Sequence, residues 1–363
     1  MAKSSRKDRK SALHVMPGVD QPSNMAESGT GGKRASLSTD EYVKGVLSGD
    51  RTRLARAITL VESNSRAHFE QAREVVKELL PHSGHSIRVG ITGVPGAGKS
   101  TFIEALGTLL IERGHKVAVT AVDPSSSLSG GSIMGDKTRM ESLAANPKAF
   151  IRPSPSGGAL GGVARKTRET ILLFEAAGYD TVLVETVGVG QSEIAVRSLV
   201  DFFLLMLVPG AGDELQGLKK GVVEIADAIL INKADGDNIP AAKRAQSEYE
   251  NALHYLTPSS KVWTPHTYTA SSTTGEGVAE IWAVVEEFVS VLNDHGEFQQ
   301  QRKYQARDWT HELVKEGLLN RFATHPEVMK RMPELETEVM EGRLPATTAA
   351  LELLKAFGVD ALD

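Results

Sequence analysis

The sequence of 363 residues contains no cysteine, few aromatic residues and no long hydrophobic run. The missing cysteine excludes disulfide bonds, thiolate metal sites and cysteine nucleophiles, and it is consistent with a reducing compartment. The longest strongly apolar run, Phe202 to Val208, is far shorter than the roughly 20 residues that a transmembrane helix needs. The N-terminus also lacks the apolar stretch of a signal peptide. We therefore expect a cytoplasmic protein without membrane contact.

Positive charge is not in excess either. The net charge is −5, so no overall basic field indicates a nucleic-acid partner. Apolar residues make up 40% of the chain, which is enough for a sizeable core. The length predicts about two domains, or one large domain with appendages.

Residues 1–36 differ from the rest of the chain in composition. They are rich in serine, glycine and proline, lack apolar periodicity, and carry seven basic against three acidic residues. This composition predicts a disordered leader. A mitochondrial presequence is the alternative, but the acidic residues and the missing amphipathic pattern argue against it.

Helical patterns flank a central segment in which strands and helices alternate. Residues 37–84 read as an N-terminal helical arm, with Ser38 as a candidate helix cap. Residues 85–293 contain short buried runs separated by helical stretches, and this alternation is typical of a parallel sheet covered by helices. The predicted strands are Ile87–Ile91, Val117–Val122, Thr181–Val184, Phe202–Val208 and Ala228–Ile231, with a further strand just before the loop at Thr269.

The C-terminal part, residues 294–363, is helical and contains no strand pattern. Helices are predicted near Gln300–Arg321, Pro326–Val339 and Pro345–Phe357. Exposed arms of this kind often pack against a second subunit, so we expect a homodimer. The predicted fold class is α/β, a P-loop NTPase with a mostly parallel central sheet and helical extensions at both ends.

A phosphate-binding loop is the strongest signal in the sequence. The G-x-x-x-x-G-K-[ST] pattern is matched between a strand ending at Ile91 and a helix predicted over Thr101 to Ile111. Glycine lets backbone N–H groups converge on phosphate oxygens without Cβ clashes. Lys99 is expected to reach the β- and γ-phosphates, and Ser100 to ligate Mg²⁺. The nucleotide-binding residues predicted here are Gly93, Val94, Pro95, Gly96, Ala97, Gly98, Lys99, Ser100 and Thr101.

A second motif selects the base. Asn232, Lys233 and Asp235 follow the predicted strand Ala228–Ile231 directly. A carboxylate at Asp235 can accept hydrogen bonds from N1–H and the exocyclic amine of guanine, and adenine offers no such donor pair. The sequence therefore predicts binding of GTP and GDP.

The loop after Thr269 gives a weaker signal for guanine. GTPases usually place a Ser-Ala pair here, whose backbone N–H meets the guanine O6. This chain has Ser271, Ser272 and Thr273, and Ser272 stands where a smaller residue is usual. An ordinary Ser/Thr-rich turn is the alternative interpretation.

Acidic residues near two further strands are candidates for the magnesium site. Glu185 follows the predicted strand Thr181–Val184 and is expected to hold a Mg²⁺ water, while the amide of Gly188 would sense the γ-phosphate. Asp123 and Asp136 lie in a polar segment with the glycines of a mobile switch loop. Either aspartate is alternatively a helix cap.

Hydrolysis without help is expected to be slow. Ras-like GTPases carry a water-positioning glutamine directly after the switch glycine, but Val189 occupies that place here. A long glycine-rich run from Pro209 to Gly221 contains Lys219 and Lys220, which are candidates to approach the phosphates. A solvated loop is the alternative. We predict that a partner stimulates turnover.

On these residues the chain resembles the MeaB/ArgK family of P-loop GTPases. The resemblance rests on GVPGAGKST at 93–101, AVDPSSS at 121–127, GGSIMGDKTRM at 130–140, ETVGVGQSE at 185–193, PGAGDELQGLKKG at 209–221 and NKADGD at 232–237. It implies a dimeric chaperone of an adenosylcobalamin-dependent acyl-CoA mutase, most often methylmalonyl-CoA mutase. It also implies contact with the cobalamin adenosyltransferase system, with no cobalamin bound directly.

The resemblance also implies residue roles. Three switch regions are expected near Asp123–Asp136, Glu185–Arg197 and Gly210–Lys220, and the last of them couples partner binding to hydrolysis. Catalytic roles then fall to Lys99, Glu185, Lys219 and Lys220, and the Mg²⁺ ligands to Ser100, Asp123, Asp136 and Glu185.

Two other functions compete with this reading. One is a kinase or transport-associated ATPase, against which Asp235 argues because ATP would not satisfy that acceptor. The other is a nickel-inserting GTPase. Proteins of that kind supply Cys/His clusters, whereas this chain has no cysteine and its only close histidine pair, His82 and His85, reads as surface.

Overall fold

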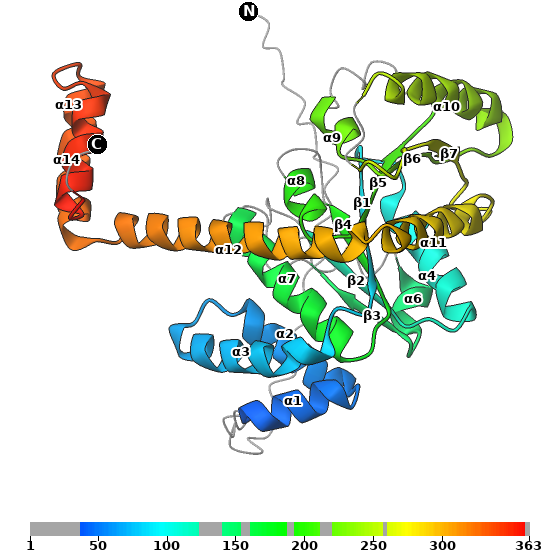
Figure 1. Ribbon diagram of the computed structural model, residues 1–363, viewed down its shortest axis with the longest axis horizontal. Helices are drawn as coiled ribbons and strands as arrows, with labels where there is room; N and C mark the ends of the chain where they lie inside the picture. Colours follow the sequence, from blue (N-terminus) through cyan, green and yellow to red (C-terminus); the bar gives the residue numbers. More distant parts are fainter. Residues whose placement is uncertain are drawn as a thin grey trace, which may run out of the picture. The chain divides into compact units, whose positions relative to one another are not determined.

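Seven parallel strands form the central sheet, in the spatial order β3-β2-β4-β1-β5-β6-β7 (Figure 1). The computed structural model describes residues 37–122, 140–153, 160–186, 192–210, 220–256 and 260–359, so the predicted leader lies outside it. The strands are β1 Ile87–Gly93, β2 Val117–Val122, β3 Ala149–Arg152, β4 Thr181–Thr186, β5 Phe202–Leu207, β6 Ala228–Ile231 and β7 Thr267–Thr269. The predicted α/β fold with a parallel sheet is confirmed. The edge strand β3 was not predicted.

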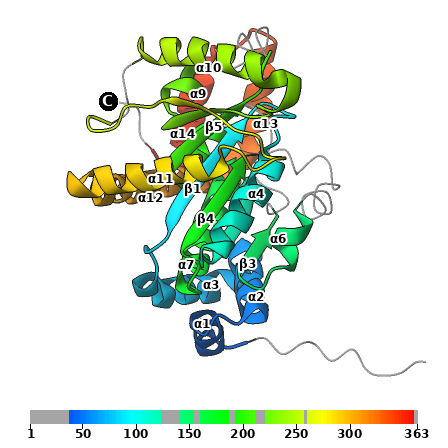
Figure 2. The ribbon, with the colours of Figure 1, turned by 90° about the vertical axis from the view of Figure 1, so that its right-hand side faces the viewer.

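The inner strands are apolar runs because helices cover both faces of the sheet. Every residue of β2, β4 and β5 is buried, as expected for parallel strands with no solvent-facing side. Helices α4 and α7 lie on opposite faces (Figures 1 and 2). The helices of this region are α4 Lys99–Glu112, α6 Glu141–Ala145, α7 Leu160–Ala176, α8 Ser192–Arg197, α9 Lys220–Glu224 and α10 Ile239–Leu253, with short 3₁₀ turns η1 Leu80–His82 and η3 Gly236–Asn238.

Three N-terminal helices pack against one another and against α7, and they confirm the predicted helices of this segment. They are α1 Thr39–Leu47, α2 Arg51–Glu62 and α3 Arg66–Leu79. Ser38 caps α1 as predicted, because the Glu41 amide donates to its Oγ (3.3 Å) and its own amide donates to the Glu41 carboxylate (2.8 Å). Such a box satisfies two of the four orphan amides of the helix start.

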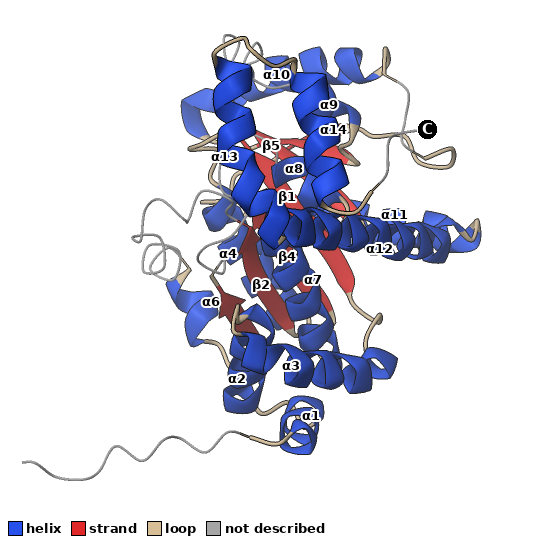
Figure 3. Ribbon diagram, turned by 90° about the vertical axis from the view of Figure 1, so that its left-hand side faces the viewer, coloured by secondary structure: helices blue, strands red, loops and turns tan. Residues whose placement is uncertain are grey.

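Four helices follow the last strand: α11 Val278–Asp294, α12 Glu297–Ala323, α13 Pro326–Met340 and α14 Ala346–Ala356. The predicted C-terminal helices are confirmed within a few residues at their ends. Helices α13 and α14 lie side by side (Figure 3). The outer half of α12 exposes Val314, Leu318 and Leu319. No helix in the described part of the chain is long and apolar enough to cross a membrane.

Charged side chains bind the amino ends of the strands together. Arg302 of α12 donates to Asp201 just before β5 (2.8 and 2.7 Å) and to the carbonyl oxygens of Gly84 and Ser86. Further ion pairs are buried at this edge, namely Arg88–Glu175 (2.8 Å) and Arg197–Asp227 (3.1 Å). The sheet thus has an ionic edge, and its opposite edge carries the predicted site residues.

Candidate nucleotide-binding site

The predicted site residues that the structure describes gather at the carboxyl edge of the sheet. The loop after β1, the end of β4 and the segments after β6 and β7 all open there. Strands β2 to β4 lie on one side of β1, and strands β5 to β7 lie on the other. Open α/β sheets bind ligands at the point where the strand order reverses in this way. The topology therefore places the P-loop at the centre of this edge.

Glycine is required in the P-loop for steric reasons. Gly93 has a φ of 149°, and a Cβ there would lie 2.1 Å from the carbonyl oxygen of Met206. Gly98 is left-handed, with a φ of 87°, and a Cβ there would meet the side-chain amide of Asn232 at 2.7 Å. The loop therefore passes close to its neighbours before α4 begins at Lys99.

Lys99 is buried inside this loop. Its Nζ donates to the carbonyl oxygens of Gly93 (2.9 Å) and Val94 (3.4 Å). Burial lowers the pKa of Lys99, and the carboxylates of Glu185 and Glu193 partly oppose that shift. An ammonium held in this way is positioned to attract the phosphates of a nucleotide.

The two predicted magnesium ligands that the structure describes meet across the P-loop. The hydroxyl of Ser100 donates to Oε1 of Glu185 at 3.1 Å. Glu185 is buried and lies inside β4, which runs two residues beyond the predicted strand end at Val184. A hydroxyl and a carboxylate are the hard oxygen donors that Mg²⁺ prefers. No cluster of three His, Asp or Glu side chains occurs among the described residues, which do not include Asp123 and Asp136.

Hydroxyl groups surround Asp235 on the base side of the site. The Oδ2 atom of Asp235 accepts hydrogen bonds from Ser271 Oγ and from Thr273 Oγ1 (3.2 Å). Asp235 itself is only partly buried, so its carboxylate combines a fixed orientation with access from solvent. An acceptor held in this way can take hydrogen bonds from a pair of donors on a ligand.

Asn232 connects the base loop to the P-loop. Its Nδ2 donates to the carbonyl oxygen of Ala97 at 2.7 Å. Its Oδ1 accepts from the amide (3.2 Å) and the hydroxyl (2.8 Å) of Ser272. Lys233, the next residue, is exposed and left-handed, with a φ of 58°. Only this non-glycine residue has a positive φ in the described ranges, and it turns the chain from β6 toward Asp235.

Several predicted residues lie outside the description. Asp123, Asp136, Gly188 and Lys219 fall in the undescribed segments 123–139, 187–191 and 211–219. Lys220 begins α9, but its side chain is not described. Their roles therefore stay predictions.

The sequence interpretation missed a contact at the base of the P-loop. The hydroxyl of Thr186, the last residue of β4, donates to that of Thr92 at 2.9 Å, and both side chains are buried. The sequence feature that could have predicted this contact is the threonine near the carboxyl end of each of these two apolar strands. This bond joins the strand that leads into the P-loop to the strand that leads into the segment with Gly188.

A protein-family model described as "Methylmalonyl Co-A mutase-associated GTPase MeaB" matches residues 54–327. The chain belongs to the MeaB family. A relative from Caulobacter vibrioides is 54% identical over 89% of the chain and 99% of its own length. The mouse "Methylmalonic aciduria type A homolog, mitochondrial" is 47% identical over 88% of the chain and 79% of its own length.

A solved structure agrees with this assignment. The crystal structure titled "LAO/AO transport system kinase" aligns with a TM-score of 0.72 and 38% identity, covering 88% of this MeaB-family chain and 98% of the other. The family resemblance and the P-loop NTPase fold predicted from the sequence are therefore confirmed.

Proposed function

We propose that this MeaB-family protein binds and hydrolyses GTP, and that it serves as a chaperone of an adenosylcobalamin-dependent acyl-CoA mutase. The observation that carries the guanine assignment is Asp235, whose carboxylate is oriented by Ser271 and Thr273 beside the P-loop. Adenine would place a ring nitrogen without hydrogen against this acceptor, so ATP would leave it unpaired.

The P-loop residues supply most of the proposed chemistry. Backbone amides of the loop and the start of α4 would bind the phosphates, and Lys99 would hold the γ-phosphate oxygen. Ser100 and Glu185 would hold Mg²⁺, which when bound neutralises charge on the phosphates. Glu185 would also fix a water through its carboxylate. Asp123, Asp136 and Gly188 are proposed to complete this region.

Intrinsic turnover is proposed to be slow, because Val189 stands where a water-positioning glutamine is usual. We propose that binding of the mutase accelerates it, with Lys219 and Lys220 approaching the phosphates. The client is proposed to be methylmalonyl-CoA mutase or a close relative. The description of the family model and the name of the mouse relative support that choice.

The proposal includes a cytoplasmic homodimer without directly bound cobalamin, in contact with the cobalamin adenosyltransferase system. Exposed apolar side chains on the C-terminal helices support the dimer, because such faces are usually covered by a partner. They are Val314, Leu318, Leu319, Met329, Met340 and Leu351. The proposed division is an arm at 37–84, a G domain at 85–293 and a dimerisation arm at 294–363.

Nucleotide competition and turnover test the proposal together. GTP should displace a fluorescent GDP analogue at least about 100-fold better than ATP, and added methylmalonyl-CoA mutase should raise the GTP turnover rate. Comparable binding of ATP would instead favour the kinase or transport-associated ATPase. Absence of stimulation by every acyl-CoA mutase tried would refute the chaperone role.

A further inference from the structure

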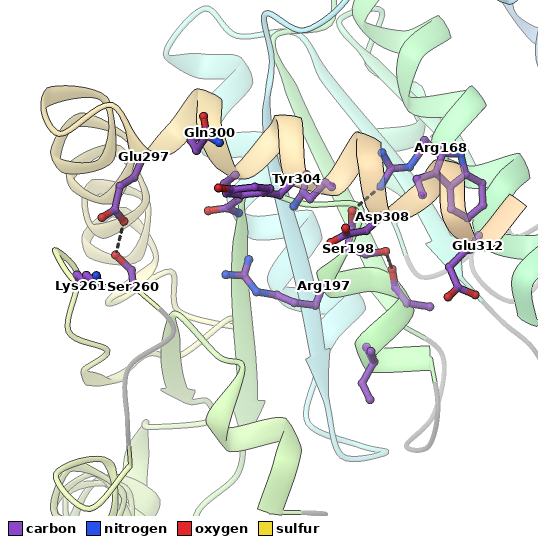
Figure 4. Close-up of a pocket in the computed structure, with 16 residues that line it drawn as sticks. Arg168, Arg197, Ser198, Ser260, Lys261, Glu297, Gln300, Tyr304, Asp308 and Glu312 are labelled. Atoms are coloured by element: carbon purple, nitrogen blue, oxygen red, sulfur yellow. Dashed lines mark hydrogen bonds between the residues drawn. The ribbon is translucent and has the colours of Figure 1, made fainter. Parts of the chain in front are cut away.

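A groove of about 1270 Å³ lies between α7, α8 and α12, and it shares no residue with the nucleotide site (Figure 4). Arg168 lies at the end opposite Ser260 and Glu297, with Tyr304 between them (Figure 4). Ser260 donates to the Glu297 carboxylate at 2.8 Å, and Lys261 lines the groove beside them (Figure 4). Arg197 also lines the groove but is paired with Asp227, so Arg168 is the cation of the other end.

Arg168 carries a charge that the described residues leave without a carboxylate. Its Nη2 donates to the carbonyl oxygen of Ser198 at 2.6 Å, and its guanidinium lies 5.2 Å from the ring centroid of Trp309. Its Nε is buried and has no hydrogen-bond partner in the described part of the chain. Burial, and next the like charge of Arg88, lower the pKa of Arg168 to about 10. A desolvated guanidinium of this kind favours a carboxylate ligand.

The acidic side chains on the facing helix are engaged elsewhere. Asp308 accepts from its neighbour Arg307 at 2.7 Å, and Glu312 lies 3.9 Å from Lys315 on the same helix. Both pairs are exposed. The two acids nearest Arg168 along α12 therefore already have basic partners, while Glu297 at the far end accepts from Ser260.

Apolar side chains flank the cation. Ile194 of α8 is 72% exposed and Tyr304 of α12 is 49% exposed, and Trp309 lines the same end as Arg168. Exposed aromatic and aliphatic side chains around a desolvated arginine are the composition of a binding hot spot. The matching occupant carries a carboxylate beside apolar side chains.

The base of the groove is attached to the end of α8. The carbonyl oxygen of Val200 accepts from Gln305 (2.7 Å), and that of Asp201 accepts from Gln301 (3.1 Å), so α12 holds the turn that follows α8. At its other end α8 begins at Ser192, directly after the undescribed segment with Gly188. A ligand in the groove would therefore contact a helix that leads to the γ-phosphate side of the site.

We propose that the groove between α7, α8 and α12 is a docking site for an acidic, apolar segment of the mutase, with Arg168 binding its carboxylate. This inference rests on the proposed chaperone function. The proposed docking surface is separate from the nucleotide site. Because α8 lines the groove and leads to that site, we expect docking to depend on the bound nucleotide.

Calorimetric titration of the full chain with purified methylmalonyl-CoA mutase, in the presence of a non-hydrolysable GTP analogue, tests the site. Arg168→Gln keeps a donor for Ser198 but removes the charge, and Ile194→Glu changes an exposed residue that folding does not require. We expect each to weaken mutase binding at least about tenfold, with Arg168→Lys recovering part of the loss. GTP turnover without mutase should be unchanged in the Arg168 variants.

Matched controls lie outside the groove. Arg165→Gln removes a charge from the same helix, and Tyr255→Ala removes an apolar residue that is 89% exposed elsewhere. Both should bind mutase as the wild type does.

Four outcomes are informative. Loss in the groove variants alone supports the inference. If both groove variants bind the mutase with the affinity of the wild type, the inference is overturned and the proposed function stays intact. No wild-type binding to any acyl-CoA mutase overturns the proposed function and the inference with it. If the groove variants change the oligomeric mass, measured by light scattering, but not the affinity for the mutase, the groove binds a second copy of this chain. That outcome also overturns the inference.

Discussion

The two edges of the sheet are built from different interactions. At the carboxyl edge, Asn232 and Asp235 join loops through hydrogen bonds to hydroxyl and amide groups. At the amino edge, buried ion pairs centred on Asp201 and Asp227 join strands to α8 and α12. Hydrogen bonds of the first kind can be exchanged for bonds to a nucleotide at low cost, whereas a buried charge cannot lose its partner cheaply. The difference separates a ligand-binding edge from an edge that fixes the fold.

The largest effect is expected from Arg302→Met at the amino edge. Removing the guanidinium leaves Asp201, whose side chain is 1% exposed, without its main partner. The free energy of unfolding should fall by about 3–5 kcal/mol, measured by urea denaturation. The affinity for GTP should be unchanged under folding conditions.

The control for Arg302 is Arg331→Met, because Arg331 pairs with Glu352 at a similar distance of 2.8 Å but in the open. It should cost less than about 1 kcal/mol. A drop in GTP affinity in the Arg302 variant would contradict the separation of the two edges.

The next effect is expected at the carboxyl edge from Asp235→Asn. The amide would place a donor against the guanine amine, so the affinity for GTP should fall about 100-fold or more. Xanthosine triphosphate carries a carbonyl in place of that amine and should bind the variant better than GTP does. Stability should change by less than about 1 kcal/mol, because Asp235 is partly exposed. Equal affinity of variant and wild type for GTP would refute the role assigned to Asp235.

A smaller effect should appear in the pH dependence of stability. Burial raises the pKa of Asp227 from 3.8 to about 6, with Arg197 and the amide of Phe203 opposing the shift. Since the folded state then binds the proton more tightly than the unfolded chain, this group stabilises the protein as the pH falls from 7 toward 5. Relative to Asp227→Asn, the wild type should gain about 1 kcal/mol over that interval, measured by denaturation at both pH values.

The sign of that shift distinguishes Asp227 from Glu175 on the same edge. Burial raises the pKa of Glu175, but the charge of Arg88 and the hydrogen bonds to this carboxylate together outweigh burial and lower the pKa. The contribution of Glu175 is therefore lost only as the pH falls below its ordinary value of 4.5. A wild-type advantage that grows as the pH rises from 5 to 7 would contradict the burial of Asp227.

The smallest effect is expected from Ser272→Ala. It removes the hydroxyl bond to Asn232 but keeps the backbone amide bond to the same oxygen. The affinity for GTP should fall about two- to fivefold, equivalent to about 0.5–1 kcal/mol. Titration calorimetry would measure it, and a loss as large as that of Asp235→Asn would show that Ser272 has a role beyond holding Asn232.

Much of the carboxyl edge could be predicted because its signals are local. The P-loop pattern requires glycine at positions 93 and 98, and the structure explains both requirements by the backbone angles and the close neighbours of these residues. Ser100 and Glu185, 85 positions apart, could be placed together because Ser100 follows β1 and Glu185 lies near the carboxyl end of the neighbouring strand β4. The short strand β3 was missed because four residues, half of them only partly buried, give little periodicity.

The amino edge could not be predicted, because its partners carry no pattern of their own. Arg302 and Asp201 are 101 positions apart, and Arg302 and Gly84 are 218 apart. In the sequence, Arg302 and Asp201 each look like an ordinary surface charge. Only the tertiary packing of α12 against the strand ends buries them, and the sequence does not state that packing. The groove beside α8 was missed for the same reason.

Asn232 forms hydrogen bonds to two different loops, and this has a consequence for protein engineering. One side-chain amide serves both the phosphate loop, at Ala97, and the base loop, at Ser272. Exchanging the base loop for one that accepts another nucleobase would also disturb the phosphate loop, unless both partners of Asn232 were transferred with it. The smallest portable module for changing nucleotide preference in this scaffold is therefore the pair of loops together with the asparagine between them.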